Sequence, residues 1–134
     1  MISEYVLGFY FDDKNHVVLI DKKHFLNGIG GKIKDREGTA KCMEREFKEE
    51  TGCEVLNWEY TTTIRGDYYV IYCFRSFGEE LSLTSSAEGL VENVDLNDLC
   101  NRKLAPFLNW LIPSHLDKDM FKNVLIENSL SEQG

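Results

Sequence analysis

The chain has 134 residues, 43% of them hydrophobic, which suffices for one compact domain with a buried core but not for two. Its 23 acidic and 15 basic residues give a net charge of −8. Such a surface repels nucleic-acid backbones, so we expect no nucleic-acid polymer as a partner. No apolar run reaches the roughly 20 residues that span a bilayer, so we expect no membrane partner either.

The compartment is predicted from the start of the chain and from its cysteines. The opening residues lack the positive and apolar regions of a signal peptide. The four cysteines form no C-x-x-C pair, which favours free thiols in a reducing compartment over a zinc site. We therefore expect a cytoplasmic protein.

The first half of the chain predicts strands and then a helix. Aliphatic and aromatic residues at 5–11 and 17–20 indicate two strands joined by a polar turn. The segment 25–31 contains three glycines, which indicates either unusual backbone dihedral angles or close approach of a partner. A helix is expected next, with Thr39 as its N-cap and Gly52 as its C-terminal stop.

The second half predicts three strands followed by two helices. The strands are 54–65, 68–77 and 89–96, with a tight turn at Gly66–Asp67, and the helices are 103–111 and 118–126, separated by a break at Pro113. A helix between groups of strands favours a mixed α/β fold whose sheet is covered on both faces. We expect a single domain over 3–127 and a flexible tail over 128–134.

The predicted first helix carries an acidic face. Glu46, Glu49 and Glu50 lie at positions i, i+3 and i+4 and therefore share one face. That face adjoins an apolar stripe made of Ala40, Met43 and Phe47. Carboxylates at the margin of a buried surface repel one another and lose solvation, and a divalent cation relieves both effects. Oxygen ligands suit Mg²⁺ or Mn²⁺, whereas the alternative is a solvated acidic helix with Glu–Lys pairs.

The acidic helix belongs to a longer pattern. Residues 31–53 read GKIKDREGTAKCMEREFKEETGC. This stretch resembles the Nudix box G-x5-E-x7-R-E-U-x-E-E-x-G-U, where U is aliphatic, at every glycine, glutamate and arginine, and Cys53 stands at the final apolar position. The resemblance implies a Nudix-type α/β/α sandwich around a mixed β-sheet and a pyrophosphohydrolase acting on phosphoric anhydrides.

The same resemblance implies roles for the box residues. Glu46, Glu49 and Glu50 would hold Mg²⁺, or Mn²⁺, and one of them or a later carboxylate would orient the attacking water. Gly31 and Glu88 would be further metal ligands, with Glu92 as the alternative to Glu88 and an exposed loop acid as the alternative role for both. Two more catalytic residues are implied: Arg45, which would hold a box glutamate, and Glu37, which would brace the loop against the helix.

Two segments bear on the substrate. Residues 26–32, LNGIGGK, resemble the N-G-x-G-G-K run of Nudix enzymes that hydrolyse oxidised purine nucleoside triphosphates. This implies that Asn27 reads the base and that Gly30, Gly31 and Lys32 approach the phosphates. The alternatives are that Asn27 tolerates a left-handed turn and that Lys32 is a surface lysine.

The second segment is 109–113, NWLIP, which resembles the W-x-x-P segment of the same enzymes. It makes Trp110 a candidate for stacking on the base, although aromatics at helical spacing are more often core residues. The acidic pair that precedes this tryptophan in the human-type enzymes is absent, because residues 105–108 read APFL. Their oxidised-base selectivity therefore does not transfer to this chain.

The sequence therefore predicts Mg²⁺-dependent hydrolysis of a nucleoside (deoxy)triphosphate, a purine or a modified purine such as 8-oxo-dGTP, to monophosphate and pyrophosphate. A dinucleoside polyphosphate or nucleotide-sugar hydrolase and a non-catalytic nucleotide-sensing domain are the alternatives. Tyr68 and Tyr69 weakly favour dinucleoside polyphosphates as substrates. Many ADP-ribose hydrolases of this family carry a proline soon after the box, whereas Pro106 and Pro113 both lie too far along the chain, so ADP-ribose is a less favoured substrate. A homodimer is possible by analogy. The histidines at 16, 24 and 115 are expected on the surface or in loops.

Overall fold

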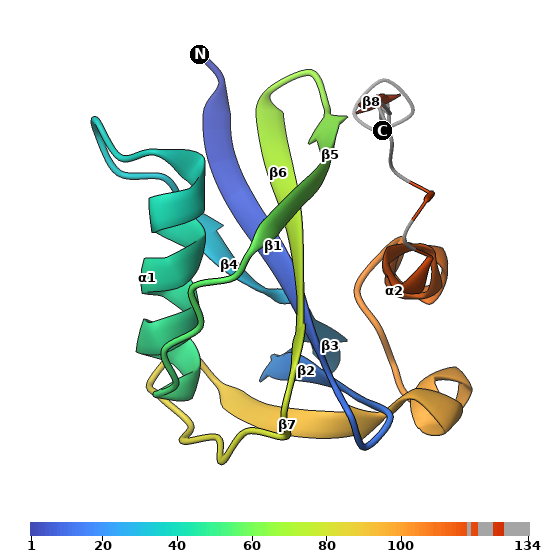
Figure 1. The fold of residues 1–134 in the computed structure, drawn as a ribbon. Coiled ribbons are helices and arrows are strands. Elements are labelled where there is room, and N and C mark those ends of the chain that lie inside the picture. Colours follow the sequence, from blue (N-terminus) through green and yellow to red (C-terminus); the bar gives the residue numbers. More distant parts are fainter. Residues whose placement is uncertain (118, 121–124, 128–134) are drawn as a thin grey trace.

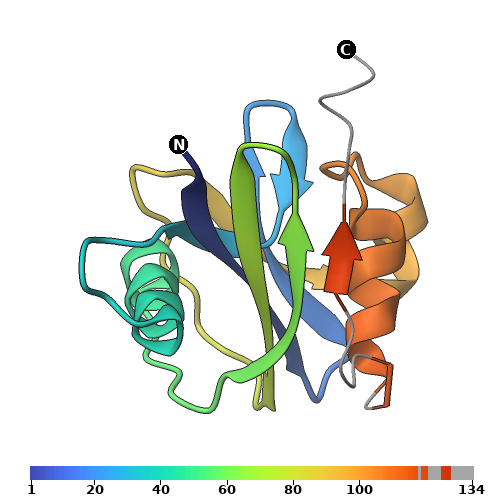
Figure 2. The same cartoon turned by 90° about the horizontal axis from the view of Figure 1, so that it is seen from above.

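The structure is a computed structural model, which describes residues 1–117, 119–120 and 125–127. A mixed β-sheet forms its middle layer, with helix α1 on one face and helix α2 on the other (Figures 1 and 2). This confirms the predicted α/β/α sandwich. Among the described residues, no helix is both long and apolar enough to cross a membrane.

The elements follow one another in mixed order. The strands are β1 (Ser3–Asp12), β2 (His16–Lys22), β3 (Phe25–Asn27), β4 (Ile29–Lys32), β5 (Glu59–Arg65), β6 (Tyr69–Gly78), β7 (Leu90–Asp95) and β8 (Leu125–Glu127). The helices are α1 (Thr39–Thr51), the 3-10 helix η1 (Leu96–Asn101) and α2 (Leu108–Leu116). The strand order is β3-β2-β1-β6-β5-β8, with β4 also paired to β1 and β7 to β2.

Strand β1 divides the core between the two faces of the sheet. Phe9 and Phe11 pack in the cluster that contains the buried face of α2. Val6 and Tyr10 pack with the buried face of α1. This alternation is the period of two that a strand buried on both faces requires. Its neighbour β6 runs parallel to β1 along its whole length, so the centre of the sheet has a fixed register.

Two of the three glycines in the segment 25–31 lie in a strand, and Gly28 lies between β3 and β4. Gly30 and Gly31 lie in β4, which pairs antiparallel with β1, and only Gly52 and Gly89 among the described glycines have positive φ. A Cβ added at Gly30 would collide with the carbonyl of Val6. Close packing of the protein's own backbone therefore explains this glycine, and unusual dihedral angles do not.

Helix α1 begins and ends close to its predicted bounds. Its C-cap is Gly52, as predicted, in the left-handed conformation with φ +76°. Its N-cap is Gly38, without a side-chain bond, so the prediction of Thr39 as the N-cap was wrong by one residue. Met43 is buried as expected, but Ala40 is exposed and Cys42 takes its place in the buried stripe.

The two hairpins predicted on either side of α1 are present, although β5 begins at Glu59, five residues later than predicted. The C-terminal predictions were less accurate. Helix α2 runs through Pro113, where we expected a break, and 103–107 are not α-helical. Pro113 lies on the exposed side of α2, so the carbonyl that lacks its N–H can bond water.

Of the helix predicted over 118–126, Leu125 and Ile126 instead belong to strand β8, and residues 119 and 120 form a turn. Residue 118, residues 121–124 and the tail predicted over 128–134 lie outside the described residues. His115 is fully buried in α2, so its prediction as a surface or loop residue was wrong.

Candidate active site

Strand β4 carries its two glycines directly past helix α1. A Cβ added at Gly31 would collide with the carboxylate of Glu46. Only a glycine therefore lets the strand backbone and this carboxylate lie side by side. The backbone of β4 therefore lies beside the acidic edge of α1, by which we mean the edge that carries Glu46, Glu49 and Glu50.

Arg45 connects the helix to the loop that precedes it. Its guanidinium donates two hydrogen bonds to Glu37, from Nε to Oε2 at 2.7 Å and from Nη2 to Oε1 at 2.9 Å. The hydrogen bonds from Arg45 lower the pKa of Glu37 to about 2. Arg45 Nη1 also lies 3.1 Å from carboxylate oxygens of Glu46 and Glu49. One guanidinium thus orders the loop and two acidic side chains together.

Glu50 has an unusual environment for a carboxylate. It is 1% exposed, and neither carboxylate oxygen has a hydrogen-bond partner among the described residues. Burial raises its pKa to about 8, and the charge of Glu46 adds to this rise. The Lys22 ammonium, 4.0 Å from Oε1, acts in the opposite direction. An isolated buried carboxylate is costly unless a cation compensates it.

The donor set fits a hard divalent cation. Glu46 and Glu50 are largely buried and Glu49 is half-exposed, so all three offer oxygen atoms at the same edge of α1. The carboxylate oxygens of these three residues do not all lie within 4.8 Å of one another. Among the described residues, only Asp12, His16 and Glu80 bring three ligand atoms within 4.8 Å of one another. The orphaned oxygens of Glu50 are therefore the feature of this edge that fits a cation.

The later-loop carboxylates differ in their surroundings. Glu88 is exposed, and its charge contributes to the raised pKa of Glu50, which places it near the acidic edge. Its loop is tied to the end of α1, where Thr84 N donates to Thr51 O at 2.8 Å. Glu92 instead accepts two hydrogen bonds from Arg102, at 2.7 and 2.8 Å.

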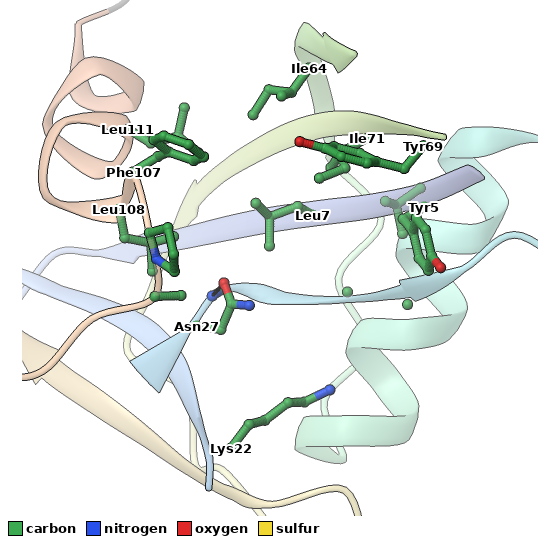
Figure 3. A pocket seen from close by; sticks show the side chains of 16 residues that line it. Tyr5, Leu7, Lys22, Asn27, Ile64, Tyr69, Ile71, Phe107, Leu108 and Leu111 are labelled. Atoms are coloured by element: carbon green, nitrogen blue, oxygen red, sulfur yellow. Dashed lines mark hydrogen bonds between the residues drawn. The ribbon is translucent and has the colours of Figure 1, made fainter. Parts of the chain in front are cut away.

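A pocket of about 410 Å³ opens beside β4. Figure 3 shows α2 on one side of it, strands β5 and β6 on another, and Lys22 on the side of α1. Of the residues that the sequence predicted to bind the substrate, Asn27, Gly30 and Gly31 line this pocket, whereas Lys32 and Trp110 do not. Lys32 lines a separate hollow beside the loop after β4.

Trp110 packs against its neighbour and not against the pocket. It is 41% exposed and makes an edge-on contact with Phe107 at 6.2 Å between ring centroids. Phe107 itself lines the pocket, together with Leu108 and Leu111. Phe107, and not Trp110, is therefore the aromatic residue of α2 that lines this pocket, and stacking of Trp110 on a base stays a prediction.

Asn27 is oriented by its own backbone. Its Oδ1 accepts a hydrogen bond from Gly28 N at 2.8 Å. Because a backbone N–H can only donate, this bond fixes the amide with its oxygen toward the backbone. The Nδ2 group then remains as a donor for another partner, so the local turn and base reading are compatible roles.

Lys22 is a charged pocket residue that the sequence did not indicate. It ends strand β2 and is the one lysine or arginine among the described residues lining this pocket. Its approach to Glu50 depends on how β2 passes α1 in three dimensions. The sequence showed only a lysine shortly after the apolar run 17–20, which did not indicate a role in a pocket.

The family model described as NUDIX domain matches residues 2–114. None of the curated proteins matches the chain significantly. Among solved structures, a MutT protein from Bacillus halodurans is similar, with a TM-score of 0.81, 19% identity, and coverage of 97% of this chain and 92% of that chain. A NUDIX hydrolase from Nitrosomonas europaea has a TM-score of 0.74 and 16% identity, covering 95% and 80%. The NUDIX domain of Shewanella oneidensis NrtR complexed with ADP ribose has a TM-score of 0.72 and 20% identity, and the match covers 84% of this chain and 85% of that chain.

Proposed function

Because this chain belongs to the Nudix family, whose model covers most of its length, we propose that it is a pyrophosphohydrolase that cleaves a nucleoside triphosphate to monophosphate and pyrophosphate. The observation that carries the proposal is the position of Glu50. Its buried carboxylate, which has no hydrogen-bond partner among the described residues and an ammonium 4.0 Å from Oε1, adjoins a pocket lined by Lys22, Gly30 and Gly31. Negative charge, positive charge and close backbone approach thus meet at one place.

Mg²⁺, or Mn²⁺, would be held by Glu46, Glu49 and Glu50, with the Gly31 backbone and Glu88 as further ligands. When bound, the cation neutralises phosphate charge and makes water a better nucleophile at neutral pH. The protein's own residues position the reactants. Catalysis of this kind depends on positioning and electrostatics and needs no covalent enzyme intermediate.

The two cationic side chains near the site, Lys22 and Arg45, would have different roles. The Lys22 ammonium, on the α1 side of the pocket (Figure 3), would bind a phosphate oxygen while its charge opposes that of Glu50. Arg45 would keep Glu46 and Glu49 oriented, because its guanidinium contacts both. Glu37, held at two points by Arg45, would brace the loop so that the helix edge stays in place.

The substrate that we propose is a purine or modified purine (deoxy)nucleoside triphosphate such as 8-oxo-dGTP. Asn27 supports a base-reading role because its Nδ2 donor remains for a ring acceptor. Apolar side chains of α2, including Phe107 and Leu111, would pack against the base. Lys32 would approach the phosphates through its backbone, which follows that of Gly31. Trp110 would hold the ring of Phe107 in place through their edge-on contact.

A nucleotide-sugar substrate is the second candidate. It is favoured by the similar Shewanella NrtR domain, which was solved with ADP ribose. A nucleotide-sensing domain without turnover is the alternative of another class. We place the protein in the cytoplasm, as a small-molecule enzyme without a nucleic-acid polymer partner and with a possible homodimer.

The test is a hydrolysis panel of dGTP, dATP, 8-oxo-dGTP, a diadenosine polyphosphate and ADP-ribose, assayed with Mg²⁺ and then with EDTA. We expect one triphosphate to be cleaved to monophosphate and pyrophosphate, and EDTA to abolish the reaction. Glu50→Gln should lower kcat at least 100-fold. Equal activity of this variant and the wild type, or tight binding of a nucleotide without any turnover, would overturn the proposal.

A further inference from the structure

Phe107 has a backbone conformation that is unfavourable for its side chain. It immediately precedes α2 with φ +74° and ψ −13°, in the left-handed region. A bulky residue occupies this region only when its surroundings hold it there. Its ring lines the pocket (Figure 3), so the strained residue is also a wall of the proposed substrate site.

The chain on both sides of Phe107 is fixed. Before it, the backbone of 103–105 is bound to β3, through Leu26 N to Lys103 O and Ala105 N to Leu26 O, both at 2.8 Å. After it, Leu111 N donates to Phe107 O at 2.8 Å and begins the helix. The conformation of Phe107 therefore depends on where the nine residues of α2 are anchored.

The far end of α2 is anchored by buried polar groups. Arg75, on β6 and 4% exposed, donates from Nη1 to His115 O at 3.1 Å and to Asp117 O at 2.9 Å. Its Nε donates to Glu59 at 2.8 Å. These bonds satisfy carbonyls at the helix end that have no partner within the helix.

His115 adds a second anchor on the same turn. Its Nδ1 donates to Leu111 O at 2.8 Å, and its Nε2 lies 2.8 Å from the hydroxyl of Thr61 on β5. The ring also packs edge-on against Phe9 of β1. Buried polar groups with defined partners fix one arrangement, because any shift leaves a donor or acceptor unpaired.

We propose that Arg75 and His115 are positioning residues for the substrate pocket. By anchoring the far end of α2 to the sheet, they hold Phe107 in its left-handed conformation with its ring on the pocket wall, and so set the affinity for the nucleotide. The identity of the ligand rests on the proposed function, whereas the anchoring does not. Neither residue lines the pocket, so both act through α2.

The test is a double-mutant cycle between Arg75→Met and Phe107→Ala, read as KM and kcat on the best nucleotide of the panel. Each single change should raise KM about tenfold and leave kcat within about twofold. In the Phe107→Ala background, Arg75→Met should raise KM by less than twofold. Sites this far apart normally act independently, so multiplying effects, or an unchanged KM in folded Arg75→Met, would overturn the proposal.

Two further variants separate positioning from loss of stability. Arg75→Lys keeps a donor and should restore KM part of the way. Val18→Ala, in the core on the α1 face, should lower the melting temperature without raising KM. If the wild type hydrolyses no nucleotide, the proposed function fails on its own. The methyl resonances of Leu108 and Leu111 then still decide the anchoring: they should shift in Arg75→Met but not in Val18→Ala, and the absence of such a shift would refute it.

Discussion

The carboxylate of Glu50 is buried and accepts no hydrogen bond from the part of the chain that the structure describes. Its pKa in the folded chain, about 8, lies above the ordinary value of 4.5. A raised carboxyl pKa means that the ionised form destabilises the fold. The loss begins as the pH rises above 4.5 and is complete only above 8. At neutral pH in the absence of metal, Glu50 therefore weakens the protein.

Glu50→Gln should consequently stabilise the metal-free protein while abolishing activity. The amide removes the charge but is itself a buried polar group. We therefore expect the free energy of unfolding at pH 7.5 to rise by ~2 kcal/mol, about half of the roughly 4 kcal/mol that the raised pKa costs at this pH. Urea unfolding in EDTA measures it. Glu49→Gln is the matched control, because Glu49 is half-exposed, and it should change stability by less than about 0.5 kcal/mol. A Glu50→Gln protein less stable than wild type would contradict this account.

For single residues, the sequence spacing predicted which side chains carry the chemistry but not the environment in which each of them lies. The spacing placed Glu46, Glu49 and Glu50 on one helix face, because a helix repeat is a local property. It did not reveal that Glu50 alone is fully buried or that Lys22 lies 4.0 Å from it. Both depend on how β2 and α1 pack, which is a contact between residues distant in sequence.

Helix α2 joins the pocket wall to a buried histidine whose protonation the fold opposes. Burial, together with the nearby charge of Arg75, lowers the pKa of His115 to about 4 from an ordinary 6.5. Above pH 6.5 the ring is neutral in both folded and unfolded chains and contributes nothing to the pH dependence. Between 6.5 and 4 only the unfolded chain binds the proton, so stability falls as the pH falls.

This predicts a loss of about 3 kcal/mol from His115 alone between pH 7.5 and pH 4. The measurement is urea unfolding across this range for the wild type and for His115→Gln. Carboxylates contribute equally to both proteins, so the difference between the two curves isolates the histidine. The variant should be less stable at pH 7.5 and should lose less on acidification. Parallel curves would show that His115 is not held neutral.

The elements that sequence patterns misplaced share a physical cause. The pattern predicted a break at Pro113, but the helix continues through it. The carbonyl four residues earlier, which receives no N–H from the proline, lies on the exposed side of the helix, where water can bond it. The pattern also left two explanations open for Gly30 and Gly31, unusual dihedral angles or close approach of a partner, and the structure shows strand residues that other groups approach closely. In each case the tertiary environment decided, and it is not encoded in the neighbouring residues. The hairpins and α1, which depend on local periodicity, were predicted closely.

For the molecule as a whole, the two faces of the sheet carry different parts of the proposed site. The acidic edge belongs to α1, the base wall to α2, and β4 passes between them with Gly30 and Gly31 on the pocket lining. A cation bound at the acidic edge would remove the electrostatic penalty at Glu50. A ligand that binds only the folded state stabilises a protein by RT ln(1 + [L]/Kd), which grows with the logarithm of the free ligand concentration.

Mg²⁺ should therefore raise the melting temperature of the wild type, by about 10 °C once the cation is about 100-fold above its dissociation constant. The rise should be larger at pH 8 than at pH 6, because the cation must displace the proton that Glu50 retains at lower pH. Thermal unfolding with and without Mg²⁺ at both pH values measures it.

Two variants decide where the cation binds. Glu50→Gln should lose most of the Mg²⁺ effect. His16→Ala, which disrupts the separate group formed with Asp12 and Glu80, should retain it. The reverse result would move the principal cation site to the group of Asp12, His16 and Glu80, which contains none of the glutamates of α1. Since Mg²⁺ prefers oxygen over nitrogen ligands, the acidic edge with its orphaned carboxylate is the stronger competitor for this ion.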